Sequence, residues 1–506
     1  MSEHPSFVPP RNGDPRLKTM RFQMLIDGKS VDADDGKEIS RPSPSYDGFI
    51  ASRIPEATPV EATRAIMAAR RAFDDGPWPK MSGKERSRIM HKIAQAILDH
   101  VEELATIDTI EGGKAISSVR GEITNAAALW EYAAGHAEGL TGETHATLGG
   151  TNFGLMIREP VGVVGVVTPW NYPFTIASER IPWALGAGCT VVLKPSEFTS
   201  GSSIRMAELA RDCGLPDGVF NVITGYGDPV GQLLAEHPAT DAMSFTGSLR
   251  VGRLVGGLAA GRLKRVGLEL GGKTPQVVFA DADLAAAADG IAQSVFHNSG
   301  QTCVAGTRLL VDNRVRDEMV ARLVELAGKV RIGDPLDDDV QVGSLIHKQA
   351  LDKICGYVEA GLTDGAVITT GGHRIGEVGN YYQPTVMTDV KPEMSIARDE
   401  IFGPVLAVFG FDTREQAITL ANDTEYGLSA YVWTSSLDNA LTTIRQIRAG
   451  RTGINTGGGG GGEMGIGGYR QSGLGTELGH YGFDEYSLFK NVFIDLAPQP
   501  MWLPNT

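Results

Sequence analysis

The stretch VGVVGVVTPWNYPFTIASERIPWALGAGCTVVLKPSE, residues 161 to 197, holds two apolar runs separated by a helical segment. VGVVGVV is apolar at almost every position, which is typical of a strand that is buried on both faces. IPWALGAG predicts a helix, and CTVVLK predicts a second buried strand. A strand, a helix and a strand in succession predict a parallel sheet with the helix packed on it.

The same alternation continues along the chain. SGSSIRMAELARDCGLP predicts a helix and GVFNVITG a strand, and residues 57 to 138 have the apolar spacing of a helical layer. After residue 271 the alternation resumes in KTPQVVFADADL, TRLLVDNRV, RDEMVARLVELAGKV, LAVFGF and AYVWT. The sequence therefore predicts an α/β protein with two doubly wound domains.

Length and composition agree with this prediction. A chain of 506 residues exceeds what one core usually supports, and 42% hydrophobic with 21% charged residues is near the globular average. Glycine is abundant at 64 residues, which predicts many tight turns and close backbone approaches. The six consecutive glycines 457 to 462 have folded-looking flanks, so they predict an internal loop rather than a linker.

Charge and cysteine content exclude several classes of protein. The formal charge of −15 gives no electrostatic basis for binding nucleic acid. The cysteines Cys189, Cys213, Cys303 and Cys355 have no C-x-x-C spacing, so neither a disulfide framework nor a metal site is expected. No apolar run reaches the length of a membrane span. We expect a cytoplasmic protein, with no membrane partner and with a loose N-terminal tail.

FHNSGQTCVAG, residues 296 to 306, raises the question of what Cys303 does. Free cysteine is most often a small buried hydrophobe, and that interpretation fits the stretch taken alone. The alternative is a nucleophile presented after the Gly-Gln-Thr turn. Other residues of the chain are needed to distinguish a buried hydrophobe from a nucleophile.

Polar residues that suit a nucleotide and a nucleophile stand at predicted strand ends. In SFTGSLRVG, Gly247 and Ser248 precede a helix whose N–H groups could bind a pyrophosphate, although no G-x-G-x-x-G follows the strand at 161 to 167. Glu197 in VVLKPSE could accept ribose hydroxyls. Glu269 in LELGGK and Asn171 in TPWNYP also follow apolar strands, where turn and capping roles are the simpler interpretation.

Together these motifs resemble the NAD(P)-dependent aldehyde dehydrogenase superfamily, of the non-phosphorylating, hydrolytic type. TPWNYP, LKPSE, FTGS, LELGGK, GQTC, EIFGPV and GGYRQSGLG occur in that family's order, from about residue 20 to the C-terminus. The resemblance implies an enzyme that oxidises an aldehyde to a carboxylic acid. It changes the favoured interpretation of Cys303 to that of a nucleophile.

The resemblance implies a role for each catalytic residue. Cys303 attacks the aldehyde to give a thiohemiacetal, whose oxyanion the Asn171 amide and the Cys303 N–H stabilise. Glu269 activates the water that hydrolyses the resulting thioester.

It also implies NAD as the cofactor, with NADP as the alternative. Lys194 and Glu197 would bind the adenosine ribose, Ser248 the pyrophosphate, and Glu400 the nicotinamide ribose. The full set of expected cofactor residues is Thr168, Pro169, Trp170, Lys194, Ser196, Glu197, Gly227, Phe245, Gly247, Ser248, Leu270, Glu400 and Phe402.

The family's architecture would divide the chain into three parts. Residues 20–140 and 160–270 would form the dinucleotide-binding domain, residues 271–475 the catalytic domain, and residues 141–159 and 476–506 an oligomerisation arm of β-strands. Because an isolated pair of strands is only marginally stable, the arm predicts a homodimer or homotetramer.

The loop after Asn455 departs from the family's pattern. Gly465, Ile466, Gly467, Gly468, Tyr469 and Arg470 stand where members commonly have Pro-Phe-Gly-Gly-x-Lys, and the glycines 457 to 462 replace aromatic wall residues. This predicts a wider aldehyde pocket. Ser178 and Glu179 are expected to face it, with Glu179 disfavouring anionic aldehydes.

Two other functions remain open. A CoA-acylating semialdehyde dehydrogenase would pass the thioester to a thiol, but such relatives typically lack the carboxylate found at Glu269. A catalytically silent structural protein on the same scaffold would be expected to lose Cys303 or Asn171, and both are present.

Overall fold

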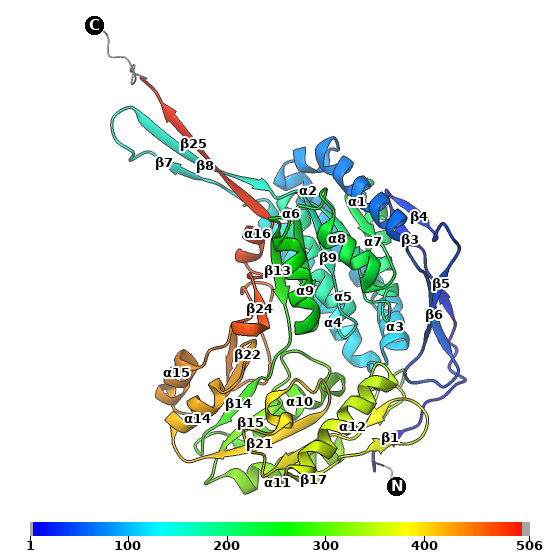
Figure 1. The fold of residues 1–506 in the computed structure, drawn as a ribbon, viewed down its shortest axis with the longest axis vertical. Coiled ribbons are helices and arrows are strands. Elements are labelled where there is room, and N and C mark those ends of the chain that lie inside the picture. The colour runs from blue at the N-terminus through cyan, green and yellow to red at the C-terminus, as the bar shows by residue number, and fades with distance from the viewer. Residues whose placement is uncertain (1–3, 498–506) are drawn as a thin grey trace.

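A computed structural model describes residues 4–497 of the chain. Two α/β units lie one above the other, and a narrow β-arm projects away from them (Figure 1). Each unit is a sheet with helices on both faces. The fold therefore confirms the predicted pair of doubly wound domains with a small arm.

The first unit contains an eight-stranded sheet in the order β24-β13-β12-β9-β10-β11-β3-β4. Its parallel strands are β9 (Val163–Val167), β10 (Thr190–Lys194), β11 (Phe220–Val222), β12 (Ala242–Thr246) and β13 (Arg265–Glu269). The edge strands are β3 (Met24–Ile26), β4 (Lys29–Val31) and β24 (Gly473–Leu474). The strand order reverses between β9 and β12, and ligands bind at such a switch point in open α/β sheets.

Helices cover both faces of this sheet. One face carries α2 (Gly83–Asp99), α3 (Val101–Gly112), α4 (Ile116–Ala137), α5 (Pro173–Ser178), α6 (Ile181–Ala187) and α7 (Gly201–Asp212). The other carries α1 (Pro59–Asp74), α8 (Gln232–Glu236) and α9 (Leu249–Ala260). On β9, Val164 packs into the first core and Val163 into the second, which explains why the strand is apolar throughout.

The second unit contains a seven-stranded sheet in the order β17-β20-β21-β15-β14-β22-β23. Its strands are β14 (Pro275–Val278), β15 (Arg308–Asp312), β17 (Val367–Thr370), β20 (Thr385–Thr388), β21 (Val405–Phe411), β22 (Ser429–Trp433) and β23 (Arg451–Ile454). The helices α10 (Leu284–Phe296) and α11 (Arg316–Lys329) pack on one face, and α12 (Lys348–Thr363) and α14 (Arg414–Asn422) on the other.

The arm is a three-stranded sheet in the order β25-β8-β7. Strand β8 (Asn152–Pro160) pairs along its whole length with β25 (Ser487–Asp495), and β7 (Glu143–His145) pairs with the outer part of β8. Residues 476 to 486, expected in the arm, lie elsewhere: α16 (Tyr481–Glu485) packs on α6, and Trp183 Nε1 donates to the Gly479 carbonyl at 2.8 Å. The C-terminal strand of the arm, β25, thus begins at Ser487. Residues 498–506, also expected in the arm, lie outside the described residues.

The N-terminal segment is packed, so the expected loose tail is wrong for residues 4–8. Strand β1 (Phe7–Val8) pairs with β16 (Ile332–Gly333), and the Phe7 and Tyr381 rings meet edge to face at 5.3 Å. His4 is buried, with Nε2 at 3.0 Å from the Ala327 carbonyl. Backbone pairing and a buried ring offset the entropy that a free tail would keep. Within residues 4–497, none of the helices has the length and apolarity needed to cross a membrane.

Candidate active site

The carboxyl ends of four parallel strands meet at one edge of the first sheet. Val167 of β9 pairs with Lys194 and with Phe245, and Thr246 pairs with Glu269. The polar residues that follow these strands therefore lie at one edge, beside the switch point between β9 and β12. Thr168, Ser196, Glu197 and Gly247 are brought to this edge by strand register alone.

A cavity of about 370 Å³ lies where the two units face each other. Residues from both units line it. The predicted residues among them are Pro169, Trp170, Asn171, Gly247, Ser248, Leu270, Cys303, Glu400 and Phe402.

The residues that line this cavity do not include the other predicted ones, Thr168, Lys194, Ser196, Glu197, Gly227, Phe245 and Glu269. Gly227 begins a short helical segment, Gly227–Gly231, and a Cβ added at Gly231 would lie 3.7 Å from Lys194 Cδ. The segment thus approaches the predicted ribose site through Gly231.

Helix α9 directs its N-terminus at the cavity. Ser248 caps the helix, and its hydroxyl accepts the Val251 N–H at 3.4 Å. A Cβ added at Gly247 would lie 2.6 Å from the Phe245 ring, so only glycine fits at this approach. Free N–H groups and the helix dipole make this end suitable for a pyrophosphate.

Lys194 and Glu197 form a pair at the end of β10. The buried Lys194 Nζ lies 3.6 Å from a Glu197 carboxylate oxygen and donates to the Pro195 carbonyl at 3.1 Å. Burial lowers the pKa of Lys194, while Glu197 partly offsets the shift. A cation and a carboxylate side by side supply the donor and the acceptor that vicinal hydroxyls need.

Glu400 and Phe402 reach the cavity from the second unit. Glu400 Oε1 accepts the Gly272 N–H at 3.1 Å, and a Cβ at Gly271 would lie 2.3 Å from Glu400 Oε2. Phe402 has a φ of +61° and meets the Trp170 ring edge to face at 5.5 Å. A left-handed phenylalanine is strained, and such strain clusters at functional sites.

Cys303 lies in the loop between α10 and β15 and is half-buried. The residue is thus neither fully buried nor at the start of a helix. Burial, together with the carboxylates of Glu400 and Glu269, raises the pKa of the thiol to about 12. At neutral pH a base must therefore remove the proton before the sulfur can act as a nucleophile.

Glu269 ends strand β13 and is only 7% exposed. Its Oε1 has no hydrogen-bond partner among the described residues. Burial raises the pKa of Glu269 above its usual range, although the Arg180 guanidinium opposes the shift. A buried carboxylate of this kind is suited to accept a proton near neutral pH.

Asn171 lies beside the loop that carries Cys303. Its Nδ2 donates to the Gln301 carbonyl at 3.0 Å, and its own carbonyl accepts Lys114 Nζ at 2.8 Å. An amide has two N–H donors, so one remains for an oxyanion.

Several residues around the site were not identified from sequence. Arg180 is 2% exposed and pairs with Glu179 at 2.8 Å and with Glu477, whose pKa is raised by burial. The available signal was the pair of adjacent charges Glu179 and Arg180 inside the mostly apolar segment 173 to 187. The other unidentified residues, which lie near the cysteine loop or the glycine run, are Lys114, Tyr172, His297, Thr302 and Arg451.

The glycine run forms a loop that is packed at its ends and open at its centre. A Cβ at Gly457 would lie 2.1 Å from the Gly290 carbonyl oxygen, and a Cβ at Gly462 would lie 3.0 Å from Leu129. At Gly458 no atom would lie within 4 Å. The Arg451 guanidinium donates from Nε to the Gly459 carbonyl at 2.9 Å.

One residue expected beside the run lies elsewhere. Ser178 is fully buried and its hydroxyl accepts Trp130 Nε1 at 3.2 Å, so it does not face a pocket. Helix α5 turns this side chain toward α4, where the indole N–H needs an acceptor.

The chain is similar to known proteins over most of its length. The chain matches the model of the aldehyde dehydrogenase family over residues 31–492. It is 39% identical over 491 residues to aldehyde dehydrogenase family 2 member C4 of Arabidopsis thaliana, covering 96% of this chain and 98% of that protein.

Solved structures are similar over nearly the whole chain. The NAD-dependent aldehyde dehydrogenase from Sinorhizobium meliloti is 58% identical with a TM-score of 0.97, covering 98% of this chain and 99% of the other. Betaine aldehyde dehydrogenase from Staphylococcus aureus, solved in complex with NAD+, is 35% identical with a TM-score of 0.93, covering 96% of each chain. By the match of the family model and by these identities, the chain belongs to the aldehyde dehydrogenase family.

Proposed function

We propose that this aldehyde dehydrogenase uses NAD to oxidise an aldehyde to its carboxylic acid through a covalent intermediate on Cys303. The observation that carries the proposal is that a half-buried thiol and an amide donor line one cavity, while the buried Glu269 carboxylate lies close enough to raise the pKa of that thiol. Cys303 comes from the second unit, whereas Glu269 and Asn171 come from strand ends of the first. This arrangement is suited to acyl chemistry next to a nucleotide.

The residues at the edge of the first sheet fit a dinucleotide. The N-terminus of α9 suits the pyrophosphate, and the Lys194–Glu197 pair suits the adenosine ribose. Glu400 would hold the nicotinamide ribose, with Phe402 and Trp170 beside the ring. When bound, NAD accepts the hydride that the oxidation of the aldehyde releases. Thr168, Pro169, Ser196, Gly227, Phe245 and Leu270 complete the proposed set of cofactor residues.

In the first half of the reaction, Glu269 takes the thiol proton, directly or through a water. The Cys303 sulfur then bonds to the aldehyde carbon. Asn171 Nδ2 and the Cys303 N–H donate to the oxygen that becomes negative, and two fixed donors in a water-poor site stabilise such a charge strongly. Lys114 keeps Asn171 in place by donating to its carbonyl.

By the second half, loss of the hydride has left a thioester on Cys303, and Glu269 has released the thiol proton to solvent. Glu269 then takes a proton from water, and the hydroxide attacks the thioester carbon. The C–S bond breaks and the acid leaves, so that the cysteine sulfur is free for the next cycle. Because Glu269 lacks a hydrogen-bond partner at Oε1 among the described residues, this oxygen is available for a water. The carboxylate also favours hydrolysis over transfer to CoA, and the presence of all three catalytic groups argues against a silent scaffold.

We also propose that the chain assembles through its arm into a dimer or tetramer. The arm projects from the body (Figure 1), and Leu488, Phe489 and Phe493 on β25 are 42%, 46% and 64% exposed. Such apolar side chains on a thin sheet favour a second copy as their partner. A cytoplasmic location stays a proposal that rests on the cysteine pattern, and cell fractionation would test it.

A turnover assay tests the proposed reaction. Purified protein is mixed with NAD and a panel of aldehydes while absorbance of the reduced cofactor is followed. We expect oxidation of at least one aldehyde, with equal amounts of acid and reduced cofactor. Turnover that required CoA would instead support the acylating reaction, and inactivity with every aldehyde would contradict the proposal.

A further inference from the structure

The chain reaches Cys303 through a left-handed turn. Asn298, Ser299 and Gly300 have φ values of +49°, +54° and +70°. Residues with a Cβ avoid this region because the side chain crowds the following carbonyl, so two of them in succession cost free energy. Tertiary contacts must therefore hold the turn.

Contacts inside the turn provide part of this restraint. Ser299 Oγ donates to the Gly343 carbonyl at 2.8 Å, and Asn298 Nδ2 donates to the Asn171 carbonyl at 3.3 Å. At Gly300 an added Cβ would lie 2.3 Å from the backbone of Gly403, so the chain passes close to another segment there. These contacts hold the middle of the turn but not its two ends.

A single hydroxyl contacts both ends. Tyr172 Oη lies 3.3 Å from His297 Nδ1, just before the turn, and 2.9 Å from Thr302 Oγ1, just before Cys303. The Tyr172 ring is itself fixed, because Lys114 Nζ lies 3.7 Å from its centroid. Tyr172 thus bridges the two ends of the strained segment.

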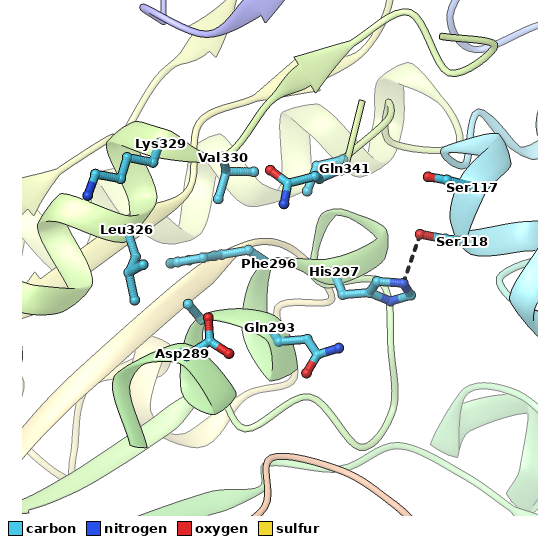
Figure 2. A pocket seen from close by; sticks show the side chains of 12 residues that line it. Ser117, Ser118, Asp289, Gln293, Phe296, His297, Leu326, Lys329, Val330 and Gln341 are labelled. Atoms are coloured by element: carbon cyan, nitrogen blue, oxygen red, sulfur yellow. Dashed lines mark hydrogen bonds between the residues drawn. The ribbon is translucent and has the colours of Figure 1, made fainter. Parts of the chain in front are cut away.

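His297 connects this bridge to helix α4. Its Nε2 lies 3.2 Å from Ser118 Oγ, as Figure 2 shows. Burial and the nearby Lys114 lower the pKa of His297 to about 4, so the imidazole is neutral at physiological pH. One consistent arrangement has Nε2–H donating to Ser118, Tyr172 O–H donating to Nδ1, and Thr302 O–H donating to Tyr172.

Packing alone does not fix the imidazole. His297 borders a cavity of about 470 Å³ between α4, α10 and α11, with Phe296 and Val330 among the other residues that line it (Figure 2). With open space on one side of the ring, its orientation depends on the hydrogen bonds to Ser118 and Tyr172. The hydrogen bonds of this network, rather than packing, therefore set the orientation of the His297 ring.

We propose that Tyr172, together with His297, is a positioning residue for the nucleophile. By hydrogen bonding to both ends of the left-handed turn, the pair holds the loop 297 to 303 in the conformation that presents the Cys303 sulfur. The inference rests on the proposed role of Cys303. In this proposal the Tyr172 hydroxyl holds the loop that carries Cys303 and does not need to contact the aldehyde.

Alkylation of Cys303 by iodoacetamide tests the proposal without requiring turnover. Tyr172→Phe removes one oxygen and keeps the ring over Lys114. We expect this variant to slow carboxamidomethylation of the Cys303 peptide, measured by mass spectrometry, about tenfold, because the hydrogen bonds to His297 and Thr302 are both lost. The half-exposed Cys213 and Cys355 serve as internal references, and their rates should not change. Tyr481→Phe, at a side chain 52% exposed, is the matched control.

Four further variants test whether Tyr172, Thr302 and His297 act through one network. Thr302→Val should slow alkylation as Tyr172→Phe does, and the double variant should be no slower than either single one, since all remove the same bridge. His297→Phe should also slow it, and His297→Gln should restore part of the rate. Additive effects, or no rescue by glutamine, would contradict the proposed network.

The outcome also separates this proposal from the proposed function. If Tyr172→Phe is alkylated at the wild-type rate and only KM for the aldehyde rises, the hydroxyl contacts substrate and the positioning role is wrong. If wild-type protein oxidises no aldehyde while alkylation still depends on Tyr172, the proposed function fails and the positioning role stands. Unchanged thermal unfolding and NAD binding would verify that the variants are folded.

Discussion

The two walls that we expect on either side of Cys303 are built on different principles. The cofactor wall consists of residues at the ends of buried parallel strands, whose relative positions are set by strand register. The proposed opposite wall is the loop after Asn455, in which Arg451 donates to the Gly459 carbonyl. The first wall is therefore expected to be rigid and specific. The second is expected to tolerate changes in size.

The difference follows from where each wall obtains its hydrogen bonds. The position of a strand end is fixed by the backbone hydrogen bonds to neighbouring strands and by the apolar cores on both faces of the sheet. The centre of the glycine run lies outside any ladder, and a Cβ at Gly458 would meet nothing within 4 Å. Substitutions should thus be costly near the strand ends and mild at Gly458 in the run.

The largest effect is expected at the nucleophile that both walls share. Cys303→Ala should abolish aldehyde oxidation, because the alanine methyl group cannot form the covalent intermediate. NAD binding, measured by calorimetry, should persist because the strand-end residues are untouched. Oxidation by this variant at more than about a hundredth of the wild-type rate would contradict the mechanism.

Glu269→Gln should have the next largest effect. The amide preserves shape but cannot take a proton from water, so deacylation should slow by about a hundredfold or more. A burst of reduced cofactor near one equivalent per site should then precede slow turnover, as seen by stopped-flow absorbance.

The same variant tests the raised pKa of Glu269. Because the carboxylate must be deprotonated to act, the wild-type steady-state rate should rise as pH increases through a pKa above the usual glutamate range. Glu269→Gln should lose this limb of the pH profile. Glu477→Gln is a useful comparison, since it removes a neighbouring buried carboxylate that pairs with Arg180.

A smaller effect is expected at the cofactor wall from Glu197. The wild-type protein should have a higher kcat/KM with NAD than with NADP, because the Glu197 carboxylate repels a 2′-phosphate. Glu197→Gln should raise the relative kcat/KM for NADP about tenfold, by removing one charge from a partly exposed site. Glu208→Gln, on helix α7, is the control, and equal ratios in all three proteins would refute the role of Glu197.

The smallest effect is expected from filling the glycine wall. Gly460 has a φ of +110°, so any side chain there is strained whatever the space. Gly458 has open space and no such constraint. Gly458→Phe should raise KM severalfold for bulky aldehydes and leave acetaldehyde nearly unchanged, since a ring of this size fills volume without touching the cofactor wall. Gly458→Ala is the control, and equal effects on both aldehydes would mean that the run does not bound the pocket.

Sequence reasoning was most accurate where residues sit in regular structure. The apolar runs at 161 to 167 and 190 to 194 correspond to β9 and β10, because consecutive apolar residues are stable only when both faces of a strand are buried. It failed for the N-terminal segment and for Ser178, since no local pattern shows which distant surface such residues will meet. Arg180, Tyr172 and His297 were missed for the same reason.

The sequence by itself therefore determined the α/β class, the strand ends that carry Glu269 and Ser248, and, through its ordered motifs, the family. Hydrophobic periodicity and turn residues act between neighbours in the chain, so they can be read from it. Only the tertiary structure decided that Tyr172 meets both His297 and Thr302, and that Arg451 reaches the Gly459 carbonyl. These contacts depend on the orientation of side chains and on how two units face each other, and packing between distant segments fixes both.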